Sequence, residues 1–242
     1  MEAEAVFRAA LILMVAAAVA AAAPIPITNT GNPWAAAPGV YGTADTAWTV
    51  NGGTAYVTTT NDFTDAGALP FTNASTSYWV RNSVNSPLGP AGGGNPSRWI
   101  SPQPAYALGL NGDPLGTYTF ATTFNYSGLD ANPYIQFYAA ADNGISQVRL
   151  NGNVVLGAII ATPGGHQQWS GVFTISSGFQ TGSNTLEFDV VNINPGGSNP
   201  LLNNPTGFRA EFATPEPAAV ALFGTVAIAL GFAVRRRRSA RG

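Results

Sequence analysis

Residues 185–190 have the sequence TLEFDV, in which apolar and acidic side chains alternate strictly. In an extended chain the apolar side chains fall on one face, and Glu187 and Asp189 fall on the other. Residues 208–212 (FRAEF) repeat the pattern, with Glu211 on the polar face. This period of two predicts strands with one face in a core and the other in water, so we interpret these carboxylates as solvated.

Similar short runs recur through residues 24–213, separated by clusters of Gly, Pro, Asn and Asp. Two pairs of runs flank Asn-Gly steps, at 51–52 and 151–152, which favour the positive φ angles of a tight hairpin. No helical period of useful length interrupts them. We therefore predict one all-β domain over 24–213, an antiparallel, jelly-roll-like β-sandwich of roughly eight to ten strands. Further strands are expected at residues 78–80, 117–124, 134–140 and 168–175.

The composition excludes several classes of site. The 242 residues include no cysteine, only 9% charged residues and one histidine, His166. Disulfides, thiolate metal ligation and multi-histidine metal sites are thereby excluded, and we interpret His166 as a solvated loop residue. Between residues 24 and 214 there are four arginines, no lysine and nine acidic residues, which gives a net charge of 4 − 9 = −5. Such a domain lacks the basic surface that nucleic acid requires.

The N-terminus is typical of an export signal. After Arg8, residues 9–23 are apolar, are rich in alanine and end in small residues. We predict a signal helix within residues 1–23, with signal peptidase cleaving near residues 20–22. A buried alanine-rich helix is the alternative.

The C-terminus, residues 214–242, has three consecutive parts. They are the motif Pro215-Glu216-Pro217, the apolar segment 218–234 and a basic cluster at 235–241. A seventeen-residue helix is about 25 Å long at ~1.5 Å per residue, which is just enough to cross a bilayer. We predict a single transmembrane helix with the body outside the inner membrane. The arginines expected to stop transfer are Arg235, Arg236, Arg237 and Arg238.

In this order of parts, the tail resembles the PEP-CTERM sorting signal of Gram-negative bacteria. The resemblance implies recognition by a membrane-embedded exosortase and cleavage near residues 215–217. It further implies passage through the inner membrane to the cell surface or an exopolysaccharide matrix. A plain single-span anchor is the alternative, and it also places the body outside.

The body resembles exported domains that often precede this tail and are similar to galactose-binding-like β-sandwiches. At Ala47, where the resemblance leads us to expect a histidine before the tryptophan, this chain departs from the pattern. The segments that carry the resemblance, in chain order, are residues 45–50, 97–100, 141–143, 150–152, 178–179 with 184–186, and 204–207.

Five tryptophans in an exported β-sandwich suggest sugar binding, because an indole face can cover the apolar face of a pyranose ring. Trp48, Trp79 and Trp99 lie in strand-like runs, so we expect them in the core. Trp169 and Trp34 flank loops and are the candidate ligand-binding residues.

Two weaker chemical hypotheses concern acidic residues. Asp142 begins an Asp-Asn-Gly turn and is a candidate ligand for structural calcium, although turn formation explains it more simply. We expect no other cofactor. Glu187, Asp189 and Glu211 could supply the carboxylate pair of a glycosidase, but their expected solvated positions favour a structural role.

The sequence as a whole therefore predicts a non-catalytic exported protein of the surface or extracellular matrix, which either binds carbohydrate or serves as a component of the matrix. The alternatives are a secreted glycan-active hydrolase that uses acidic residues and a membrane-anchored adhesion protein.

Overall fold

The computed structural model describes residues 24–31, 42–57, 97–104, 112–130, 132–161, 169–193 and 205–213. Within those ranges the protein contains strands and no helix, which confirms the all-β prediction. The predicted signal helix and transmembrane helix lie outside the described residues. The strands are β1 (Ala44–Val50), β2 (Gly53–Val57), β3 (Ile100–Ser101), β4 (Gly116–Tyr126), β5 (Ile135–Asp142), β6 (Gly144–Leu150), β7 (Asn153–Leu156), β8 (Phe173–Ile175), β9 (Gly182–Asn192) and β10 (Gly207–Phe212).

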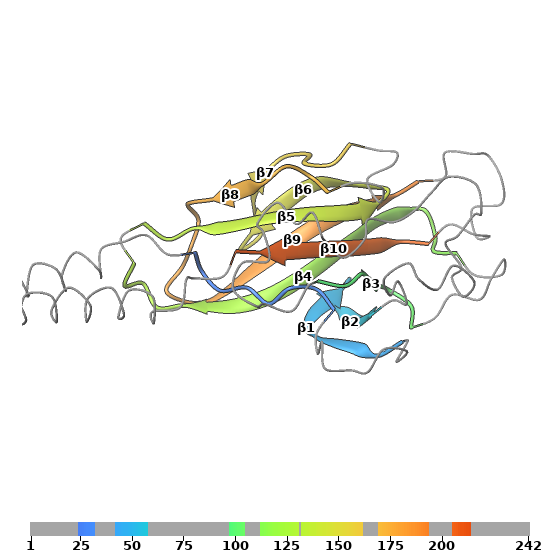
Figure 1. Ribbon diagram of the computed structural model, residues 1–242, viewed down its shortest axis with the longest axis horizontal. Helices are drawn as coiled ribbons and strands as arrows, with labels where there is room; N and C mark the ends of the chain where they lie inside the picture. Colours follow the sequence, from blue (N-terminus) through green and yellow to red (C-terminus); the bar gives the residue numbers. More distant parts are fainter. Residues whose placement is uncertain are drawn as a thin grey trace, which may run out of the picture.

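All ten strands belong to one sheet in the order β7-β6-β9-β4-β1-β2-β3-β10-β5-β8. Each neighbouring pair is antiparallel. The sheet bends back on itself, so that β5 and β10 lie over β9 and β4 (Figure 1). Phe137 of β5 meets Phe188 of β9 edge to face with ring centroids 5.1 Å apart. The result is a two-layered antiparallel body, and its jelly-roll connectivity stays a prediction.

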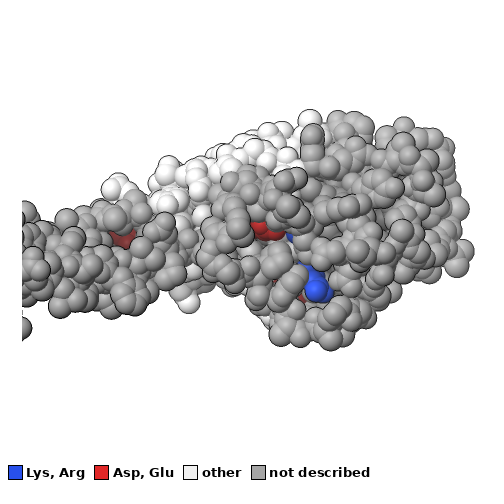
Figure 2. Space-filling view, in the orientation of Figure 1, with Lys and Arg blue, Asp and Glu red and all other residues white. Residues whose placement is uncertain are grey.

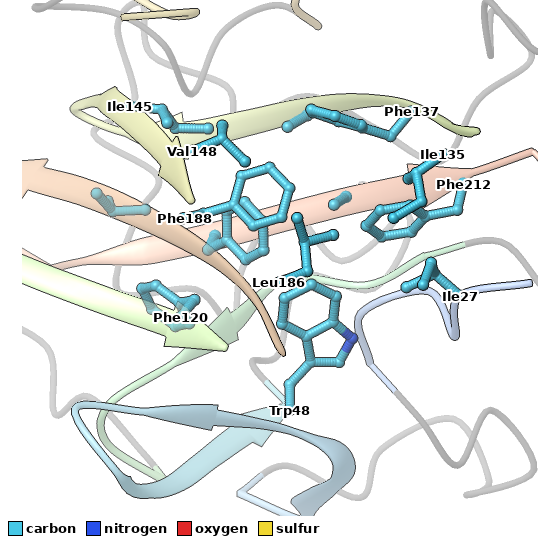
Figure 3. Close-up of a cluster of buried hydrophobic side chains, with 14 of the residues drawn as sticks. Ile27, Trp48, Phe120, Ile135, Phe137, Ile145, Val148, Leu186, Phe188 and Phe212 are labelled. Carbon is cyan, nitrogen blue, oxygen red and sulfur yellow. The ribbon is translucent and has the colours of Figure 1, made fainter. Parts of the chain in front are cut away.

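The core lies between the two layers and is rich in aromatic side chains (Figure 3). Trp48 stacks on Phe212 at a centroid distance of 6.0 Å, and its indole nitrogen donates to the Thr28 carbonyl at 2.9 Å. Trp48 and Trp99 are both buried, as predicted, and Trp79 lies outside the described residues.

Both predicted Asn-Gly hairpins are present. Asn51 and Gly52 have φ angles of 49° and 76°, and Asn151 and Gly152 have φ angles of 54° and 78°. These angles match the left-handed region that a two-residue hairpin turn requires. The turns join β1 to β2 and β6 to β7.

Two expectations about strands are wrong. The polar faces of β9 and β10 are not fully solvated, because Asp189 is 6% exposed, Glu211 is 7% exposed and every residue of β10 is buried. Side chains of the adjacent strands β4 and β6 bond to Asp189, whereas Ser97 and Trp169 pack over β10. The alternating pattern alone does not reveal these contacts. The strand expected over 168–175 is shorter, and it includes only Phe173–Ile175.

Both ends of the body meet the start of β5. Near the N-terminus, Ile25 is buried in the core and donates its backbone N–H to the Tyr134 carbonyl at 2.7 Å. Just after β10, Ala213 donates its N–H to the Gln136 carbonyl at 2.8 Å. Because Tyr134 and Gln136 are two residues apart, the chain enters and leaves the described body at the same end.

Candidate functional site

The outer face of β5 and β10 carries the candidate site. Phe208, Ala210 and Phe212 point into the core, so the period of two directs Arg209 and Glu211 outward. Tyr138 lies directly opposite Glu211 in the ladder between the strands. These three side chains are nevertheless buried, because other segments pack over this face.

A hydrogen-bonded network satisfies these buried polar groups. The Ser97 hydroxyl donates to Glu211 Oε1 at 2.8 Å and accepts from Arg209 Nε at 2.7 Å. Arg209 Nη2 lies 3.4 Å from Glu211 Oε1, and the Tyr138 hydroxyl donates to Glu211 Oε2. Removing Arg209 or Glu211 would leave the other charge buried without its partner, and a buried unpaired charge strongly destabilises the folded state. The network therefore holds Arg209 and Glu211 in fixed positions.

Trp169 lies over this network. The Arg209 guanidinium carbon is 4.8 Å from the centre of the Trp169 ring, within the range of a cation–π contact. Tyr138 meets the same ring edge to face at 4.4 Å and 82°. Ser170, the next residue, fixes the chain by donating its N–H to the Ala139 carbonyl at 2.8 Å. Trp169 as a whole residue is half-buried, and these contacts position its ring. Trp169, Tyr138, Arg209, Glu211 and Ser97 are called the Trp169 cluster below.

The outer face of the other layer carries a second polar group, centred on Arg149 of β6. Arg149 pairs with Glu187 at 3.2 Å and with Asp189 at 2.8 Å, both on β9. Gln147 and Thr119 also donate to the Asp189 carboxylate, at 2.6 and 2.8 Å. Burial acts to raise the pKa of Asp189, but these hydrogen bonds outweigh it and hold the pKa below its ordinary value.

Charged atoms are sparse on the visible described surface, where Figure 2 shows small red and blue patches beside uncharged areas.

Asp142 lies where β5 ends, as the turn prediction requires. Its Oδ1 accepts from the Asn143 side-chain amide at 2.8 Å, while Asn143 Oδ1 accepts from the Ile193 N–H at 2.8 Å. The described part of the chain holds no group of three or more His, Cys, Asp or Glu residues able to bind a metal ion. Calcium binding at Asp142 stays an untested prediction.

Of the two predicted ligand-binding residues, Trp169 lies within the described ranges, and its contacts are given above.

No helix among the described residues is long and apolar enough to cross a membrane. The second ligand-binding candidate and the sorting and stop-transfer residues lie outside the described ranges: Trp34, Pro215, Glu216, Pro217, Arg235, Arg236, Arg237 and Arg238. His166, predicted to be a solvated loop residue, also lies outside them.

The residues that hold Trp169 in place were not predicted from the sequence. Arg209, Ser97 and Tyr138 are far apart in the sequence, and no motif links them. The rarity of arginine could have singled out Arg209, because only four arginines occur between residues 24 and 214. An arginine that alternates with core residues of a strand needs a partner, and this one has Glu211.

Comparison with known proteins identifies the tail. Residues 213–238 match the family model of the PEP-CTERM protein-sorting motif. The motif marks an exported, cell-surface-sorted protein whose C-terminus is processed by an exosortase. No curated protein matches the chain.

A solved structure similar to part of the chain is the native structure of a family 35 carbohydrate binding module from Clostridium thermocellum. It is 12% identical, with a TM-score of 0.28, and the match covers 49% of this chain and 78% of the other. At that TM-score the match carries no argument about fold or ligand.

Proposed function

We propose that the body is a non-catalytic carbohydrate-binding domain displayed outside the cell, with Trp169 as the platform for a sugar ring. The observation that supports the proposal is the half-buried Trp169, whose ring Arg209 and Tyr138 hold in a fixed orientation. An aromatic ring held in place loses little conformational entropy when a ligand stacks on it. Tryptophan offers a large apolar face for the C–H groups of a pyranose.

The ligand class that best fits the Trp169 cluster is a neutral glycan. The Arg209 guanidinium donates to Ser97 and pairs with Glu211, so its charge is already balanced within the cluster. A uronic acid or sulfate would need a cation that is available to it. Neutral sugars need apolar contact and hydrogen bonds alone.

The environment of the acidic residues supports a non-catalytic domain over a hydrolase. A general acid needs a raised pKa, and the pKa of Asp189 is lowered. Glu187 pairs with Arg149, and Glu211 accepts from Ser97 and Tyr138 within a buried network. Each carboxylate is therefore committed to structural partners.

In the life of the protein, signal peptidase would first remove the N-terminal segment. The tail would then hold the protein transiently in the inner membrane of a Gram-negative cell, until the exosortase releases it to the surface or exopolysaccharide matrix. The body would keep its two-layered, jelly-roll-like form throughout. A membrane-anchored adhesion protein is the outcome if the tail is never cleaved.

A glycan array, screened with and without calcium, tests the proposal. Wild-type protein is expected to bind neutral glycans, and Trp169→Ala to lose that binding while remaining folded. Val154→Ala, which removes an exposed apolar side chain on β7, is the matched control and should bind as wild type. Product release from any glycan that vanishes in Glu187→Gln would instead favour the hydrolase.

A further inference from the structure

The end of the body from which the sorting tail departs carries an exposed leucine. Pro24 bridges to Tyr134 at the entry of the chain, and Ala213 bonds to Gln136 at its exit. The loop that follows β4 leads to Tyr134, so it turns at this same end. Within it, Leu129 is 88% exposed.

Local contacts hold the Leu129 loop, defined as residues 127–130, in one conformation. The Tyr126 hydroxyl donates to the Asp130 carbonyl at 2.8 Å, and the Leu129 N–H donates to Ser127 Oγ at 3.3 Å. Gly128 has a φ of +76°, and a Cβ there would lie 2.6 Å from Thr181 Oγ1. These contacts hold the backbone of the loop, which presents the Leu129 side chain to solvent.

Two partly exposed aromatic rings lie next to this loop. Phe179 packs against Tyr126 with ring centroids 5.9 Å apart and against Phe124 at 6.5 Å. Rings that combine an apolar body with a polar tip, as Tyr126 does, suit the boundary between lipid and water. Single exposed leucines are common on protein surfaces, and this one is distinguished by its position at the end of the body from which the tail departs.

The tail places this end close to a bilayer. Residues 214–217 separate Ala213 from the apolar segment 218–234, and four extended residues reach at most about 14 Å. Tyr134 precedes Gln136 by two residues, so it lies ~7 Å further along the direction in which the tail departs. The Leu129 loop precedes Tyr134 in the chain and lies at this same end. With the apolar segment in a membrane, the loop is within reach of the lipid headgroups.

We propose that the Leu129 loop rests on the lipid bilayer while the sorting tail is uncleaved, with Leu129 in the headgroup interface. One leucine cannot hold a free protein on a membrane, because even a single covalently attached acyl chain binds a membrane only marginally. The tail raises its effective concentration at the membrane to the millimolar range, which makes weak contact persistent. The contact holds the body in one orientation above the Pro-Glu-Pro segment and ends when the tail is cleaved. It rests on the sorting motif and is independent of sugar binding.

Site-specific fluorescence in the full-length chain tests the contact. The natural sequence has no cysteine, so Leu129→Cys can carry a single NBD label. Leu115→Cys is the matched control, because Leu115 is 51% exposed and precedes Gly116, which pairs with Asn192 at the opposite end of the body. Both proteins are reconstituted in vesicles of phosphatidylethanolamine and phosphatidylglycerol, with or without lipids that carry a quencher on the acyl chain.

The expected result is quenching several-fold stronger at position 129 than at position 115. Near-UV circular dichroism checks that both labelled proteins are folded. Quenching at 129 that does not exceed quenching at 115 overturns the proposal.

Discussion

Single residues decide how this protein tolerates acid and loss of aromatic packing. The folded-state pKa of Asp189 is lowered, so its contribution to stability is present above the unfolded pKa of about 3.9 and is lost as the pH falls through the folded value. Arg149→Met removes the hydrogen bond and charge that lower this pKa, while burial continues to raise it. The acid-unfolding midpoint, followed by near-UV circular dichroism, should move to higher pH. Thr117→Ala, on an exposed position of β4, should leave the midpoint unchanged.

Trp99 and Trp169 should separate packing from ligand binding. Trp99 is fully buried, so Trp99→Ala should lower the free energy of unfolding by about 3–5 kcal/mol. From sequence alone, Trp169→Ala is expected to leave the melting temperature nearly unchanged. The contacts with Arg209 and Tyr138 raise that expectation to a loss of ~1 kcal/mol. Urea unfolding of both variants measures the difference, and a larger loss for Trp169→Ala would contradict the placement of the two rings.

At the scale of elements, each Asn-Gly hairpin is bonded to the strand beside it. Asn151 donates its N–H to the Thr185 carbonyl at 2.9 Å and accepts the Thr185 N–H through Oδ1 at 3.0 Å. Asn51 makes the same pair with Thr119, at 2.9 and 2.9 Å. Asn151→Gly keeps the positive φ but loses the side-chain acceptor, which should cost about 1 kcal/mol. Asn151→Ala also loses the acceptor and adds strain at this φ, so it should cost more. Equal melting temperatures for the Gly and Ala variants would show that the side-chain hydrogen bonds matter and the turn geometry does not.

The strands themselves could be predicted from sequence because alternation assigns side chains to faces. It placed Leu186 and Phe188 inward correctly, and the two Asn-Gly pairs located their hairpins. Alternation says nothing about what lies over the opposite face. Glu211 accepts hydrogen bonds from Ser97, 114 residues earlier in the chain, and from Tyr138, 73 residues earlier. Such long-range pairing depends on how the sheet bends, so the Trp169 cluster was beyond reach from the sequence, even though Trp169 itself was singled out.

For the whole molecule, the two ends of the chain determine where the body can go. The chain enters and leaves the body at the start of β5, so the signal segment ends and the sorting tail begins at the same end of the body.

Changing Pro215, Glu216 and Pro217 together to alanine removes the processing segment but keeps the apolar span and the arginines. Export should continue, because the N-terminal segment is intact, and full-length protein should accumulate in the inner membrane, because the arginines still stop transfer. Cell fractionation with mass determination measures this, and Ser239→Ala, beyond the four arginines, is the matched control. If the triple variant reached the surface at its normal mass, sorting would not depend on Pro-Glu-Pro. Retention of the full-length variant in the inner membrane would instead keep the body anchored there, separated from the apolar segment by the four residues 214–217, which is the geometry of an anchored adhesion protein.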